Sequence, residues 1–127
     1  MTPFAQSLAF NISPGEESVE ASFSVPAGGH LVIEFITASV TLGIAQSPAV
    51  QFVVRTGGIP PRGLRHALVL FPQGTFGQVD LYAASQLVRL YPDQGSQVRF
   101  EFSRSDTAGL ASGSITVTGF VSPEPVP

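Results

Sequence analysis

Apolar and polar residues alternate one by one along much of this chain. In the clearest run, residues 19–25, valine, alanine and phenylalanine take turns with glutamate and serine until Pro26 interrupts the pattern. A period of two residues is typical of a β-strand with one buried and one solvated face. Related segments recur to the end of the sequence, so the pattern predicts an all-β protein.

Nine segments carry this alternation or a short apolar run between turn residues. They are residues 4–12, 18–25, 30–42, 50–55, 64–71, 76–83, 86–91, 97–104 and 114–121. Residues 30–42 begin with apolar side chains on both faces, as expected of a central strand. Short strands separated by Gly and Pro predict an antiparallel β-sandwich of about eight to nine strands with Greek-key connections, and we favour a jelly roll.

Glycine and proline mark the expected breaks. Residues 56–63 read TGGIPPRG and predict the central loop, because proline lacks a ladder donor and glycine is costly to order. Residues 72–74 predict a turn between two strands. Residues 79–90 leave a short helix open as an alternative, since Val79, Tyr82 and Gln86 also fit a helical spacing.

The chain of 127 residues is long enough for one domain with a substantial core. We expect a single β-sandwich domain over residues 1–121. Residues 122–127 read SPEPVP and predict a proline-rich tail in an extended, polyproline-like form.

Composition narrows the classes of function. The chain has no cysteine and no lysine, and its formal net charge is −3, so it offers no thiol chemistry and no basic field for a nucleic acid. It contains no run of about 18 apolar residues, which argues against a membrane-spanning helix. The first residues lack the features of a secretory signal. Localisation stays open: extracellular or cell envelope if a signal was removed, or a virion or other assembly.

Only 12% of the residues are charged, against about 25% in an average soluble domain. Such a neutral exterior predicts that part of the surface is covered by another subunit. An exposed sheet edge can pair with another chain, and lysine, which commonly prevents such pairing, is absent. We therefore expect a non-enzymatic structural or interaction module that self-associates into a homo-oligomer. The alternative is a monomer with a surface of Ser, Thr, Gln and Gly.

Candidate catalytic groups are few and scattered. His30 and Glu34 share a strand face but lie about 13 Å apart along it, too far to share a proton. His66 lies between apolar neighbours, which favours a semi-buried structural histidine with its hydrogen bonds satisfied. A site that combined His66 with Asp80 or Glu101 remains a hypothesis, because nothing in the sequence places them together. The sequence predicts no enzyme.

No metal or cofactor site is predicted either. Glu16, Glu17 and Glu20 form an acidic cluster that carries oxygen ligands suited to calcium, but a solvated acidic turn explains it better. Asp106 lies in a segment that predicts an Asx-type turn.

Carbohydrate binding is the rival function, because jelly rolls include lectin domains. The chain lacks tryptophan and has two tyrosines, so an aromatic sugar platform is poorly supported. A polar pocket built by loop residues is the remaining form of such a site. Its candidate residues are Arg62, Arg65, Asp93 and Gln94. The expected partners are thus a second copy of the chain or, in the alternative, a glycan.

Several segments together resemble a group of small uncharacterised bacterial proteins. They are VPAG at 25–28, LVIEF at 31–35, VRLY at 88–91 followed by Pro92 and Gly95, FSRSDT at 102–107, and GFV at 119–121. These motifs consist of turn and core residues. The resemblance implies a shared β-sandwich fold and brings no known activity to this chain.

Overall fold

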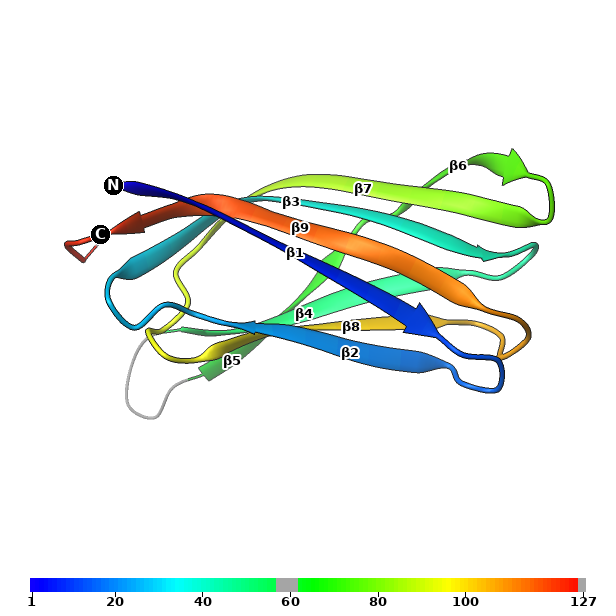
Figure 1. Ribbon diagram of the computed structural model, residues 1–127, viewed down its shortest axis with the longest axis horizontal. Coiled ribbons are helices and arrows are strands. Elements are labelled where there is room, and N and C mark those ends of the chain that lie inside the picture. Colours follow the sequence, from blue (N-terminus) through cyan, green and yellow to red (C-terminus); the bar gives the residue numbers. More distant parts are fainter. Residues whose placement is uncertain (57–61, 126–127) are drawn as a thin grey trace.

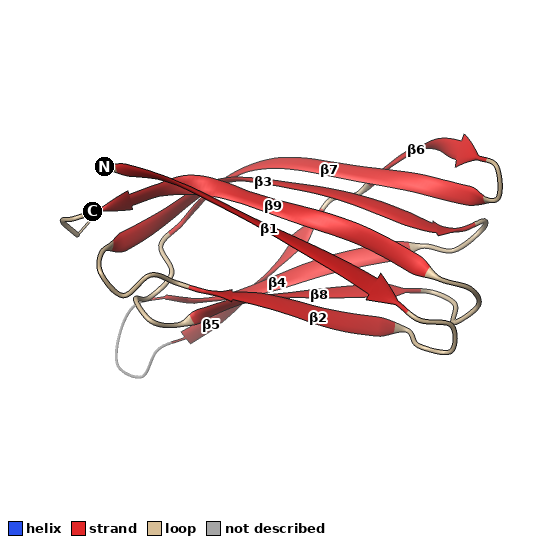
Figure 2. Cartoon of the chain, viewed as in Figure 1, coloured by secondary structure: helices blue, strands red, loops and turns tan. Residues whose placement is uncertain are grey.

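The structure is a computed structural model that describes residues 1–56 and 62–125. Within these ranges it contains nine β-strands and no helix, as Figure 2 shows. The strands are β1 (Thr2–Ile12), β2 (Ser18–Ser24), β3 (His30–Gly43), β4 (Pro48–Thr56), β5 (Arg62–Leu68), β6 (Phe71–Phe76), β7 (Val79–Leu90), β8 (Gln97–Arg104) and β9 (Ala111–Ser122). No helix in the described ranges is long and apolar enough to span a membrane.

The strands form two antiparallel sheets that face each other (Figure 1). The larger sheet has the order β1-β9-β3-β7-β6, and the smaller has the order β2-β8-β4-β5. The chain alternates between the sheets from β1 to β4 and again from β7 to β9. Two four-stranded sheets connected in this way form a jelly roll, with β6 added beside β7. The predicted β-sandwich with jelly-roll topology is confirmed.

The core lies between the sheets and is built from the alternating apolar positions. Phe10 packs on Phe102 with ring centroids 4.4 Å apart, and Phe52 packs on Phe100 at 5.4 Å. These contacts join β1 to β8 and β4 to β8. The largest fully buried side chains are Phe52, Phe100, Phe102, Ile12, Leu31, Ile33, Ile36, Leu42, Ile115, Val32, Val40 and Val50. Outside β3, where Val32 is buried without belonging to the core cluster, the period of two identified the inward faces correctly.

The central strand β3 carries a β-bulge. Its register against both neighbours shifts between Ile33 and Phe35: Glu34 has no counterpart on β9, whereas on the β7 side two residues, Val88 and Arg89, lie opposite it. At this place β9 approaches β3 closely: a Cβ added to Gly119 would collide with the carbonyl oxygen of Val32. Glycine at this position is thus required by the close approach of two backbones.

The structure corrects the prediction between residues 69 and 91. Residues 72–74 belong to strand β6 rather than to a turn, and 79–90 form one continuous strand rather than two strands or a helix. Pro72 is tolerated because β6 is an edge strand, and a register shift between Pro72 and Gly74 absorbs the irregularity. The helix is excluded because β7 pairs with β3 along nearly its whole length.

The predicted central loop is shorter than expected. Thr56 ends β4, and Arg62 and Gly63 belong to β5, while residues 57–61 lie outside the described ranges. At the carboxyl end, β9 runs to Ser122, whose hydroxyl accepts a hydrogen bond from the Glu124 amide. The division into a domain and a proline-rich tail remains a prediction.

Candidate functional site

The candidate sugar-site residues lie in two parts of the fold. Arg65 is on the outer face of β5 and donates a hydrogen bond of 2.8 Å to Gln51 Oε1. Gln94, in the turn before β8, donates from Nε2 to the carbonyl of Gly29 at 2.6 Å. Asp93 is in the same turn, and its amide donates to the carbonyl of Arg55. The hydrogen bond from Gln94 to Gly29 therefore joins the turn before β8 to the turn before β3.

The Arg62 side chain lies outside what the structure describes. A pocket that unites it with Arg65, Asp93 and Gln94 therefore remains a prediction. The outer face of the smaller sheet carries a hollow whose lining residues differ from these four candidates. It has a volume of about 260 Å³ and is lined by Arg55, Ser96, Gln97 and Arg99.

Arg55 and Arg99 were missed by sequence reasoning, although each occupies the polar position of an alternating strand. Arg99 lies opposite Val53 and Ser22 in the register of the smaller sheet. In the next row Glu20 lies directly opposite Glu101. This outer face therefore gathers charges of both signs at its surface: Glu20, Arg55, Arg65, Arg99 and Glu101.

The histidine site considered from the sequence is not formed. His66 points inward and stacks on Phe52, with ring centroids 5.0 Å apart. Its Nε2 is buried without a hydrogen-bond partner, contrary to the expectation of a satisfied histidine. Asp80 instead accepts from the Thr75 hydroxyl and the Ala45 amide, and Glu101 belongs to the outer face of β8. The described ranges contain no group of three or more potential metal ligands.

Arg104 is a buried cation that the sequence analysis did not single out. It is 5% exposed, and its guanidinium donates to the carbonyls of Ser13, Glu16, Thr107 and Ala108. The backbone of the predicted acidic turn thus accepts hydrogen bonds from an arginine. The expected Asx-type turn follows Arg104, since the Ala108 amide donates to Asp106 Oδ1. The Arg104 side chain therefore joins the β1–β2 turn to the β8–β9 loop.

The outer face of the larger sheet has a different character. Three rows of side chains cross β1, β9, β3 and β7 without a charge, and we call them the neutral face. They are Ser7, Thr116, Thr37 and Ser85; Ala9, Ser114, Ser39 and Ala83; and Asn11, Ser112, Thr41 and Leu81. Hydroxyl groups bridge neighbouring strands in two places, from Ser7 to Thr116 and from Ser39 to Ser114.

Exposed apolar side chains are spread along the border of the larger sheet formed by β6, β7 and the residues just before β6. We call this group the apolar edge: Val69 (59% exposed), Phe71 (60%), Phe76 (61%) and Leu87 (83%). Phe71 lies opposite Ala83 and Phe76 opposite Val79 in the pairing of β6 with β7. Side chains of opposed residues share a sheet face, so both phenylalanines extend the outer surface of the larger sheet.

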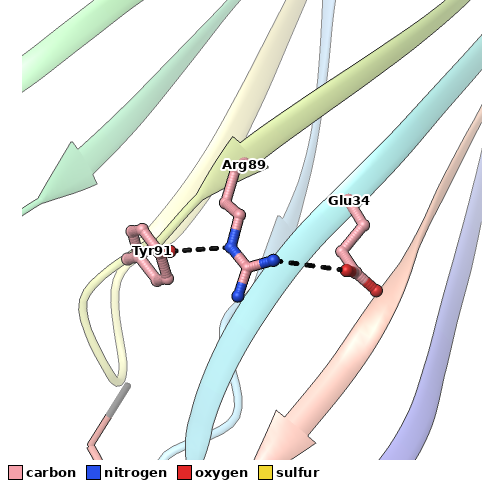
Figure 3. A network of polar contacts seen from close by, with 3 residues as sticks. All are labelled: Glu34, Arg89 and Tyr91. Carbon is pink, nitrogen blue, oxygen red and sulfur yellow. Dashed lines mark hydrogen bonds and ion pairs between the residues drawn. The ribbon is translucent and has the colours of Figure 1, made fainter. Parts of the chain in front are cut away.

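One charged network lies at the end of β7, as Figure 3 shows. Arg89 donates from Nε to the Tyr91 hydroxyl at 2.8 Å and forms an ion pair with Glu34 at 3.8 Å. The contact with Tyr91, and to a smaller degree the charge of Glu34, raises the pKa of the Arg89 guanidinium above its ordinary value. The ion pair with Glu34 holds the guanidinium towards β3.

No family model matches the chain, and no curated protein matches it. Among solved structures, the chain is similar to a chain in the structure of infectious bursal disease virus, Gx strain, with a TM-score of 0.52 and 16% identity over 93% of its length. A second similar chain comes from the Gt strain of that virus, with a TM-score of 0.41 and 13% identity over 89%. Our chain spans 32% of each viral chain. The Gx likeness shows a shared fold.

Proposed function

We propose that this chain is a non-enzymatic structural module that self-associates into a homo-oligomer. The observation that carries the proposal is the apolar edge. Phe71, Phe76 and Leu87 are more than half exposed and lie on two paired strands at one border of the larger sheet. Large apolar side chains exposed along one border of a sheet are typical of a surface that another protein covers.

The distribution of charge supports the same proposal. The neutral face adjoins the apolar edge, so two copies that approach there would remove few charged groups from water, and such removal is costly. The face of the smaller sheet, with three arginines and two glutamates, keeps the protein hydrated on the other side. The likeness to a viral chain concerns the fold alone and does not identify the assembly.

Sedimentation velocity on the purified chain tests the proposal. Over a concentration range from micromolar to millimolar, we expect species heavier than the 13.3 kDa monomer, with a fraction that grows with concentration. A chain that sediments as a monomer over the whole range would contradict self-association.

Carbohydrate binding is the second candidate, and the hollow of Arg55, Ser96, Gln97 and Arg99 favours it. These side chains offer hydrogen-bond donors at one open surface, suited to hydroxyl or carboxylate groups of a glycan. The test is a glycan array with the intact chain and with Arg99→Ala. Competable binding to one sugar class that Arg99→Ala abolishes would support this function, and an array without reproducible binding would contradict it.

A further inference from the structure

On the side away from β3, strand β7 pairs with a neighbouring strand over only about half of its length. Its pairing with β6 extends from Val79 to Ala83. From Ala84 to Leu90, β7 pairs with β3 on one side, and in residues 1–56 and 62–125 no strand pairs with it on the other. The backbone hydrogen bonds of the described turns and loops do not involve this span either. We call Ala84–Leu90 the open edge.

An open edge exposes backbone groups that can pair with another strand. In an antiparallel ladder, about half of the amide and carbonyl groups of a strand point to each side. Those of the open edge that point away from β3 therefore meet no strand in the described part of the same molecule. A span of seven residues is as long as strand β2, which pairs along its whole length with β8.

The other edge strands of the two sheets carry protective features that are absent from residues 84–87 of the open edge. Pro3 lies near the start of β1, Pro72 and a register shift interrupt β6, Glu20 is on β2, and Arg65 is on β5. Proline, charge and irregular register are the devices that keep sheet edges from pairing. Residues 84–88 read ASQLV and contain neither proline nor charge, and the register shift of β7 against β3 is confined to Val88 and Arg89, near one end of the open edge.

Arg89 does not take over this protective role. Its guanidinium lies between Tyr91 and Glu34, and Glu34 belongs to β3, on the side of β7 away from the open edge (Figure 3). The ion pair and hydrogen bond therefore direct the charge back over the sheet of its own molecule.

Leu87 combines two properties at the centre of the open edge. It is the middle residue of Ala84–Leu90, and its side chain is 83% exposed. It also lies opposite Phe35 on β3, so the two side chains share the outer face of the sheet. A strand added beside β7 would cover Leu87 and extend this apolar row.

We propose that the open edge pairs antiparallel with the open edge of a second copy, around a two-fold axis at Leu87. The two larger sheets then become one continuous sheet. This inference rests on the proposed function and names the contact that produces the homo-oligomer.

The occupant is a second copy because the open edge is complementary to itself. With Leu87 on the two-fold axis, Gln86 lies opposite Val88 of the second copy and Ser85 opposite its Arg89. No like charges meet, and every pairing repeats on both sides, as an isologous interface requires. The row Phe35–Leu87 continues into the same row of the second copy, which buries apolar surface on the outer face.

A disulfide cross-link tests the geometry, because the chain has no cysteine of its own. Opposed residues of an antiparallel pair have Cα atoms about 4.5–5.5 Å apart, within the range for a disulfide. We expect Leu87→Cys to form a covalent dimer under mild oxidation. The matched control is Leu110→Cys, which is 60% exposed in the β8–β9 loop and should stay largely unlinked.

A charge at the same position tests the energetics. Leu87→Lys places two ammonium groups opposite each other across the axis, and we expect the dissociation constant to rise at least about tenfold. Leu110→Lys should leave it unchanged. Circular dichroism of both variants checks that the fold is retained.

The outcomes separate this contact from the proposed function. A heavier species in the parent chain together with the Leu87→Cys dimer and weakened Leu87→Lys association supports both. If the parent chain self-associates but Leu87→Cys links no better than Leu110→Cys and Leu87→Lys assembles normally, the contact is wrong and self-association stands. A parent chain that is monomeric throughout overturns both.

Discussion

At Arg104, one guanidinium satisfies backbone carbonyls from two separate connections. Its donors reach Ser13 and Glu16 on the β1–β2 turn and Thr107 and Ala108 on the β8–β9 loop. A buried cation without hydrogen bonds would be strongly destabilising, and here the carbonyl dipoles compensate it. The residue holds two loops at the same end of the sandwich.

Replacement of Arg104 by methionine should therefore be costly. Arg104→Met leaves several part-buried carbonyls without a donor, and we expect the free energy of unfolding to fall by about 3 kcal/mol. Urea unfolding followed by circular dichroism measures the change. Arg99→Met, on the exposed face of the smaller sheet, is the control and should cost less than about 0.5 kcal/mol. Equal stability of the two variants would show that the network contributes little.

Among the elements, β9 depends on glycine where it passes the bulge of β3. Gly119 faces the backbone of Val32 at a distance that leaves no room for a Cβ atom. Because backbone rather than a flexible side chain fills the space, the neighbouring strand would have to move. The close pairing of β9 with β3 thus depends on the absence of a side chain at Gly119.

Gly119→Ala is expected to lower the free energy of unfolding by about 2 kcal/mol or more, as overpacking does in other cores. Gly28→Ala is the matched control, since a Cβ there meets nothing within 4 Å. Thermal or urea unfolding of both variants provides the measurement. A Gly119→Ala chain as stable as the Gly28→Ala chain would contradict the tight contact.

Element boundaries were predictable where an alternating or apolar run ends at clear turn residues. β1, β2, β3, β4 and β8 match the predicted segments within two residues at each end. β6 was missed because Pro72 and Gly74 look like turn residues, and β7 was divided because Ala83–Gln86 is a weakly apolar stretch. In both cases pairing with a distant strand outweighs the local preference.

Across the whole molecule, the charged side chains are unevenly distributed. The smaller sheet carries Glu20, Arg55, Arg65, Arg99 and Glu101 on its outer surface, whereas the neutral face of the larger sheet has no charge in its three rows. The charged side chains of the smaller sheet are therefore separated from an uncharged surface on the larger sheet. Composition predicted a neutral exterior, and the fold decides which sheet carries it.

This separation predicts how association responds to salt. Contacts made through the apolar edge and the open edge involve few ion pairs, so screening should have little effect. We expect the dissociation constant to change less than about tenfold between low salt and 1 M NaCl. Sedimentation equilibrium in the two buffers measures it. Dissociation at high salt would indicate that the charged face of the smaller sheet forms the contact instead.

The candidate sites were less predictable than the fold. Sequence reasoning chose Arg62, Arg65, Asp93 and Gln94 for a polar pocket. The structure uses Gln94 to join two turns, and Arg65 lies on a strand, as the predicted segment 64–71 implied. Sequence reasoning passed over Arg55 and Arg99, which line the hollow. Alternation gives the face that a residue occupies and leaves its neighbours on other strands undetermined.

The amino-acid sequence by itself determined the strand class, the inward faces and the neutral character of the surface, because these depend on a local period of two and on composition. Only the tertiary structure decided that β6 extends the larger sheet, that β7 keeps an open edge, and that Arg104 lies among carbonyls. The physical reason is that hydrogen bonds between strands join residues far apart in the chain, and no local pattern specifies which strand lies next to which.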